Sequence, residues 1–148
     1  MNKQLKLILG AMTFGDQVDF DSSLAMVDSY LKTGNNELDT AYIYNDGSSE
    51  VILGELKARR NVISLATKVH PKISGKLDRN GILTQFNTSL NRMKSESIDI
   101  LYFHFPDSII PDEEALETVA ELYQQKKIKE FGLSNYPAWL VVDLWHIC

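Results

Sequence analysis

The chain has 148 residues, of which 44% are hydrophobic and 24% are charged, so we expect residues 1–148 to form a single domain. This composition excludes long disorder and a disulfide scaffold. Twenty Asp and Glu outnumber fifteen Lys and Arg, and the net charge of −5 argues against nucleic acid as a partner. The single cysteine, Cys148, favours a reducing, cytoplasmic compartment, and no apolar run approaches the roughly 20 residues that span a membrane.

Short apolar runs alternate along the chain with amphipathic stretches of about twelve residues, which is typical of βα units. The third and fourth of these runs are almost continuously apolar, which indicates strands buried on both faces of a parallel sheet. The predicted strands are residues 5–10, 37–39, 62–67, 98–103 and 128–133.

A helix is predicted after each strand, from polar starts followed by apolar residues at helical spacing. Gly34 suits the left-handed position that ends the first helix. The fifth helix continues to the last residues without a stop signal. In chain order, the predicted starts are Asp21 or Ser22, Ser48 or Ser49, Asp78, Pro111-Asp112 and the residues after Tyr136-Pro137.

Five βα units of about thirty residues each predict an α/β fold of the TIM-barrel type, because eight such units give roughly the 250 residues of a closed (β/α)8 barrel. We therefore expect a partial barrel, the first five-eighths, cut inside its fifth helix. A complete doubly wound sheet of five strands is the alternative. It is disfavoured because residues 10–15 lack the G-x-G-x-x-G spacing of a phosphate-binding loop.

The carboxyl ends of the strands in a parallel barrel share one face, where barrel active sites form. Polar or reactive side chains stand at each of these predicted ends. Each has an ordinary structural explanation by itself, and the joint placement is what favours a site. In chain order they are Met12 and Thr13, Asp39 with Tyr44 five residues later, Lys68, His104, and Ser134-Asn135.

These residue types suit the protonation of a carbonyl oxygen. A phenol has a pKa near 10, and a neighbouring ammonium such as that of Lys68 is expected to lower the pKa of Tyr44. Asp39 would hold the lysine, and a neutral His104 would hydrogen-bond the substrate oxygen. No side chain delivers hydride, so a nicotinamide cofactor is implied and no metal site is predicted.

The motifs carry a resemblance to a known family. Residues 38–44 (LDTAYIY), followed by 47–50 (GSSE), resemble the first signature of the aldo-keto reductases. Residues 98–104 (IDILYFH) and 132–136 (GLSNY) are similar to later blocks of that family, in the same order. Residues 10–12 (GAM) and 104–107 (HFPD) look most like the aflatoxin-aldehyde reductase branch.

The resemblance implies that NADPH reduces a small aldehyde or ketone, with Tyr44 as the general acid and Lys68 lowering its pKa. Asp39 would pair with Lys68, and His104 would orient the carbonyl. The nicotinamide carboxamide would be held by Ser134 and Asn135, with Met12, Thr13 and Asp39 lining the cofactor bed.

The family's groups for stacking on nicotinamide and for holding the adenosine 2′-phosphate have no counterpart in these 148 residues, so activity is expected to be impaired. The alternative is a non-catalytic barrel fragment that acts as a binding or regulatory partner. Its open surface would be completed by another copy of the chain or by a barrel-completing partner. A channel-associated β subunit is a third, less favoured class.

Overall fold

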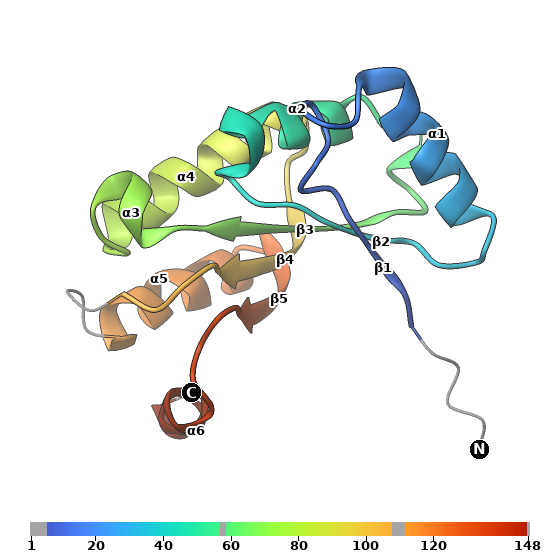
Figure 1. The fold of residues 1–148 in the computed structure, drawn as a ribbon. Helices are drawn as coiled ribbons and strands as arrows, with labels where there is room; N and C mark the ends of the chain where they lie inside the picture. The colour runs from blue at the N-terminus through green and yellow to red at the C-terminus, as the bar shows by residue number, and fades with distance from the viewer. Residues whose placement is uncertain (1–5, 57–58, 108–111, 148) are drawn as a thin grey trace, which may run out of the picture.

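The computed structural model describes residues 6–56, 59–107 and 112–147. Its centre is a five-stranded parallel sheet in the order β1-β2-β3-β4-β5, in which each strand pairs with the next one along the chain. Within the described residues, β1 and β5 each have one neighbour, so the curved sheet is open, as predicted for a partial barrel (Figure 1). The strands are β1 (Ile8–Gly10), β2 (Glu37–Asp39), β3 (Ser64–Val69), β4 (Ile98–Phe103) and β5 (Ile128–Leu133).

Helices connect these strands. A short 3₁₀ turn, η1 (Tyr44–Gly47), follows β2 and leads directly into α2. Within the described residues, no helix is long and apolar enough to cross a membrane. The α-helices are α1 (Phe20–Leu31), α2 (Ser48–Gly54), α3 (Pro71–Ser74), α4 (Arg79–Arg92), α5 (Asp112–Gln124) and α6 (Ala138–Ile147).

The predicted helix starts are largely confirmed. The carboxylate of Asp78 caps α4 by accepting the Gly81 N–H at 2.8 Å. The first helix starts earlier than predicted, because Asp19 accepts the Ser22 N–H at 2.8 Å and takes the capping role assigned to Asp21 or Ser22. The second, fourth and fifth predicted helices correspond to α2, α5 and α6, which begin at Ser48, at Asp112 and just after Pro137. Pro111 lies outside the described residues.

The third strand is displaced from its predicted position by two residues. Val62 lies in a turn, where its N–H donates to the Arg59 carbonyl at 3.0 Å, and its side chain is 58% exposed. The strand therefore begins at Ser64 and continues to Val69. Lys68 lies inside the strand rather than just after it, and the short helix α3, which was not predicted, follows His70.

The two faces of the sheet differ in chemistry. Alternate residues such as Leu38, Leu65 and Leu101 point towards the helices and are buried in the main hydrophobic core. The opposite face is more polar and carries Asp39 and Lys68 near the carboxyl ends of β2 and β3. The packing of the core thus leaves the polar ends of the strands on the open, concave side of the sheet.

Candidate active site

The predicted site residues Asp39 and Lys68 form an ion pair at the carboxyl ends of β2 and β3. The Lys68 Nζ lies 2.6 Å from Asp39 Oδ2 and also donates to the Thr40 carbonyl at 2.7 Å. Lys68 is buried, whereas the Asp39 side chain is partly accessible. A buried ammonium needs such partners, because an unpaired charge in the protein interior is costly.

Tyr44 and His104 complete the predicted group. The Tyr44 ring lies edge-on to the His104 ring, with centroids 5.6 Å apart. The Lys68 Nζ is 5.1 Å from the centre of the Tyr44 ring. The structure therefore brings all four side chains together at the carboxyl ends of the strands; a direct contact between Lys68 and the Tyr44 hydroxyl stays a prediction.

The pKa of Tyr44 moves opposite to the expected direction. Burial raises it above 10, and the negative charge of Asp39 raises it further. The Lys68 ammonium, which was expected to lower this pKa, donates instead to Asp39 and to the Thr40 carbonyl. Burial also lowers the pKa of Lys68, against the opposing attraction of Asp39. Tyr44 is consequently a protonated phenol at neutral pH, the form that donates a proton.

His104 is uncharged at neutral pH. Burial, together with the positive charge of Lys68 and the neighbouring His70, lowers the pKa of His104 to about 4. Its Nδ1 atom is buried without a hydrogen-bond partner among the described residues. Such an unpaired polar atom beside an ion pair marks a place where a ligand could supply the missing contact.

Two of the predicted cofactor residues, Ser134 and Asn135, lie on the rim beside His104, whereas Met12 and Thr13 lie in the loop after β1. Asn135, which has a left-handed backbone (φ 61°), donates from Nδ2 to the His104 carbonyl and to Ser134 Oγ, both at 2.9 Å. Met12 is 59% exposed, and Thr13 is half-buried. An amide and a hydroxyl on this rim fit a nicotinamide carboxamide, which needs both a donor and an acceptor.

His70 was not predicted and belongs to this neighbourhood. Its ring lies 5.1 Å from that of His104, and its Nδ1 accepts the Lys72 N–H at 3.1 Å, so its proton sits on Nε2. Burial lowers the pKa of His70, with Lys72 adding to the effect. Because β3 extends to Val69, His70 directly follows the strand. With the correct end of the strand, its position would have predicted His70 as a site residue.

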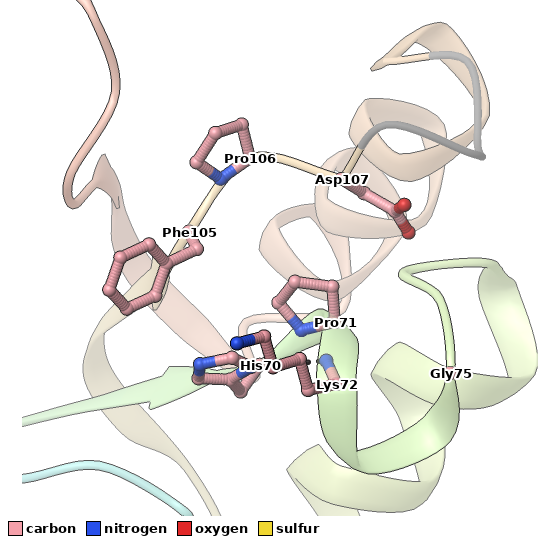
Figure 2. A pocket seen from close by; sticks show the side chains of 7 residues that line it. All are labelled: His70, Pro71, Lys72, Gly75, Phe105, Pro106 and Asp107. Carbon is pink, nitrogen blue, oxygen red and sulfur yellow. Dashed lines mark hydrogen bonds between the residues drawn. The ribbon is translucent and has the colours of Figure 1, made fainter.

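A cleft of about 320 Å³ opens next to His70, between the loops after β3 and β4. Figure 2 shows Phe105 and Pro106 across from His70 and Pro71. The Phe105 ring stacks on His104 with centroids 5.3 Å apart, which connects the cleft to the group formed by Asp39, Tyr44, Lys68 and His104. The lining residues are His70, Pro71, Lys72, Gly75, Phe105, Pro106 and Asp107.

The described residues contain no group of three or more His, Cys, Asp or Glu side chains arranged to hold a metal ion.

Comparison with known proteins identifies the family of the chain. The sequence profile of the Aldo/keto reductase family matches residues 6–146, so this chain belongs to that family. It is 39% identical to human aflatoxin B1 aldehyde reductase member 4 over an alignment of 145 positions, which covers 95% of this chain and 44% of the human protein. The resemblance found in the sequence is thereby confirmed.

Solved structures show the same fold. An aldo-keto reductase from Bacillus halodurans, in its holo form, superposes with a TM-score of 0.84 at 31% identity, covering 95% of this chain and 49% of that one. An aldo-keto reductase from Klebsiella pneumoniae in complex with NADPH gives a TM-score of 0.82 at 25% identity, covering 94% and 49%. The chain thus spans about half the length of the relatives that it matches.

Proposed function

We propose that this chain carries the proton-donating part of an NADPH-dependent carbonyl reductase, with Tyr44 as the general acid. The observation that carries the proposal is the Asp39–Lys68 pair, 2.6 Å apart, beside the edge-to-face rings of Tyr44 and His104. The complex of the Klebsiella relative with NADPH supports the choice of cofactor.

NADPH, when bound, supplies the hydride that reduces the carbonyl carbon. The residues of this chain handle the proton. Neutral His104 orients the carbonyl oxygen by a hydrogen bond, and the Tyr44 hydroxyl gives its proton to that oxygen. The phenolate left behind is stabilised by the Lys68 ammonium, and Asp39 holds Lys68 in place. Ser134 and Asn135 would hold the nicotinamide carboxamide, with Met12, Thr13 and Asp39 along the cofactor bed.

The substrate class is a small aldehyde or ketone. The human relative is named for an aldehyde, that of aflatoxin B1. The cleft beside His70 has apolar walls made by Pro71, Phe105 and Pro106, which suit the hydrocarbon part of such a substrate.

The test uses residues 1–146 joined to the part of the human relative that follows its matched region; we call this protein the completed chain. Reduction of an aromatic aldehyde is followed by the loss of NADPH absorbance. We expect Tyr44→Phe to lower kcat/KM by a factor on the order of 10²–10⁴, because the proton donor is lost.

The matched control is Tyr123→Phe, which removes a hydroxyl from a tyrosine that is 60% exposed on α5. It should leave kcat/KM unchanged. Equal activity of the completed chain with Phe or Tyr at position 44 would contradict the proposed role.

A binding role for the 148 residues alone is the second candidate. It is favoured by the exposed aromatic residues of α6, Trp139 and Trp145, together with the open edges of β1 and β5. In that case a second polypeptide, either another copy or a barrel-completing partner, would cover these surfaces. This candidate would be favoured over the first if residues 1–148 bound such a partner while the completed chain had no reductase activity.

A further inference from the structure

The backbone just after Tyr44 is held in an unusual conformation. Asn45 and Asp46 have φ values of 51° and 54°, and Gly47 follows with 92°. Residues other than glycine rarely adopt such left-handed angles, and a run of them persists only where surrounding contacts hold it. Contacts from other parts of the chain must therefore hold the segment that carries Tyr44.

Asn45 attaches one side of this segment to the loop after β1. Its Nδ2 donates to the carbonyls of Met12 and Phe14, both at 2.8 Å. This explains how Asn45 itself tolerates its angle, but it leaves Tyr42 and Asp46 to be fixed by another group.

Arg92, in the last turn of α4, contacts the segment on both sides of Tyr44. Its Nη1 donates to the Tyr42 carbonyl at 2.9 Å, and its guanidinium lies 4.4 Å from the centre of the Tyr42 ring. Its Nη2 makes a longer contact of 3.5 Å with the Asp46 carbonyl. The guanidinium also fills the space beside Gly47, where a Cβ would lie 2.2 Å from Arg92 Cζ.

Glu50 fixes the position of Arg92. Its side chain is fully buried, and its Oε2 accepts from Arg92 Nη1 at 3.0 Å. Its Oε1 accepts from Thr67 Oγ1 at 2.7 Å. Thr67 directly precedes Lys68 in β3, so one carboxylate links the arginine that holds the Tyr44 segment to the strand that carries Lys68.

We propose that Arg92 and Glu50 are positioning residues that set the place of the Tyr44 hydroxyl relative to Lys68. Neither touches the reacting atoms. This inference rests on the proposed function for its effect on catalysis, whereas its structural part, the fixed position of Tyr44, is independent of any activity.

The test replaces Arg92 in the completed chain with Met, which keeps the length of the side chain but removes the charge and the donors. The tyrosines are labelled as 3-fluorotyrosine, and the Tyr44 ¹⁹F resonance is identified by its loss in Tyr44→Phe. We expect Arg92→Met to shift or broaden this resonance. We also expect kcat to fall about tenfold to a hundredfold while KM changes little, since misplacing a catalytic group by about 1 Å has such a cost.

Arg79→Met is the matched control, because Arg79 lies at the other end of α4 and pairs with Glu121 on the surface. It should change neither the resonance nor kcat. Arg92→Lys, which keeps the charge towards Glu50 but loses the planar fork, should restore part of kcat. Glu50→Gln is the milder variant should Arg92→Met fail to fold, and it should lower kcat in the same way.

The proposal is overturned if the Tyr44 resonance and kcat are the same in Arg92→Met and the parent, or if Arg79→Met causes an equal change. It is also overturned if Arg92→Lys and Glu50→Gln, both folded, leave the resonance unmoved. Failure of the proposed function looks different: the parent completed chain would reduce no aldehyde, while the Tyr44 resonance would still respond to Arg92→Met.

Discussion

His104 is a buried imidazole packed against the rings of Tyr44 and Phe105, and its charge state decides what it can do. With a pKa of about 4, it is neutral throughout the physiological range. A neutral ring can donate a hydrogen bond to a carbonyl oxygen without competing with Tyr44 as a strong acid. Its burial therefore separates the roles that we propose for the two side chains.

The same low pKa predicts an acid-sensitive fold. In the unfolded chain a histidine titrates near 6.5, so the unfolded state binds a proton before the folded state does. Stability is then present above pH 6.5 and is lost as the pH falls through about 4. We expect His104 to account for a loss of about 2–3 kcal/mol in the free energy of unfolding across this window.

The measurement is urea denaturation of the completed chain from pH 7 to pH 4. Protonation of carboxylates also lowers the stability of proteins in acid, so the parent is compared with His104→Gln. The free energy of unfolding of His104→Gln should fall less steeply with decreasing pH. His70→Gln should retain most of the slope, although the pKa of His70 is also lowered. Parallel curves for the parent and His104→Gln would show that His104 titrates normally in the folded state.

The sequence predicted the placement of Asp39, Tyr44, Lys68 and His104, because parallel strands bring their carboxyl ends to one face whatever the exact strand boundaries. It did not predict the direction of the Tyr44 pKa, which depends on burial and on how Lys68 divides its hydrogen bonds. Arg92 was also missed. A basic residue in the last turn of a helix has an ordinary explanation, and its partner Glu50 is 42 positions away in the chain.

At the scale of elements, the strand order and the start of α4 followed from the sequence, since apolar runs and a capping aspartate are local signals. The start of β3 did not. Val62 and Ile63 both favour a strand, but the turn that begins at Arg59 keeps Val62 out of the sheet. Tertiary pairing with β2 and β4 then carries the strand on to Val69.

Gly47 shows how closely one element is fitted to another. We expect Gly47→Ala to lower the free energy of unfolding by about 1–3 kcal/mol, because its left-handed backbone disfavours a side chain and the new methyl group would displace the Arg92 guanidinium. That displacement breaks the contacts of Arg92 with Glu50 and the Tyr42 carbonyl.

Gly34→Ala separates these two effects. Gly34 has φ 83°, yet a Cβ there meets nothing within 4 Å, so its substitution reports the backbone cost alone. Urea denaturation should show a larger loss for Gly47→Ala than for Gly34→Ala. Equal losses would mean that Arg92 moves aside without cost.

At the scale of the whole molecule, the open sheet leaves few of its apolar side chains in water. Leu7 is exposed near the β1 edge, but Phe131 on β5 packs against Phe103 on the helix-facing side, with ring centroids 4.8 Å apart. Alternation along the strands places polar groups on the concave face instead. A group of large exposed apolar residues lies on α6, which Figure 1 shows set apart from the other helices.

These features predict that residues 1–148, expressed alone, have little or no reductase activity. Trp145 is 80% exposed, and Trp139, Val142 and Ile147 are also exposed on α6. Burying a large apolar side chain stabilises a protein by about 1.5–3 kcal/mol, so several left in water are comparable with a net stability of about 5–15 kcal/mol. We therefore expect the isolated 148 residues to aggregate or to require a partner that covers α6 and the β1 and β5 edges.

Cofactor binding should fail for a separate reason, because the residues proposed to hold the nicotinamide end, Met12, Thr13, Ser134 and Asn135, include no cationic group for a phosphate. The measurement is fluorescence titration of residues 1–148 with NADPH, followed by an assay with an aromatic aldehyde, with the completed chain as the positive control. Micromolar NADPH binding together with turnover that Tyr44→Phe abolishes would contradict the prediction. It would mean that five βα units suffice for the chemistry, and that the concave polar face around Lys68 is stable without the rest of a barrel.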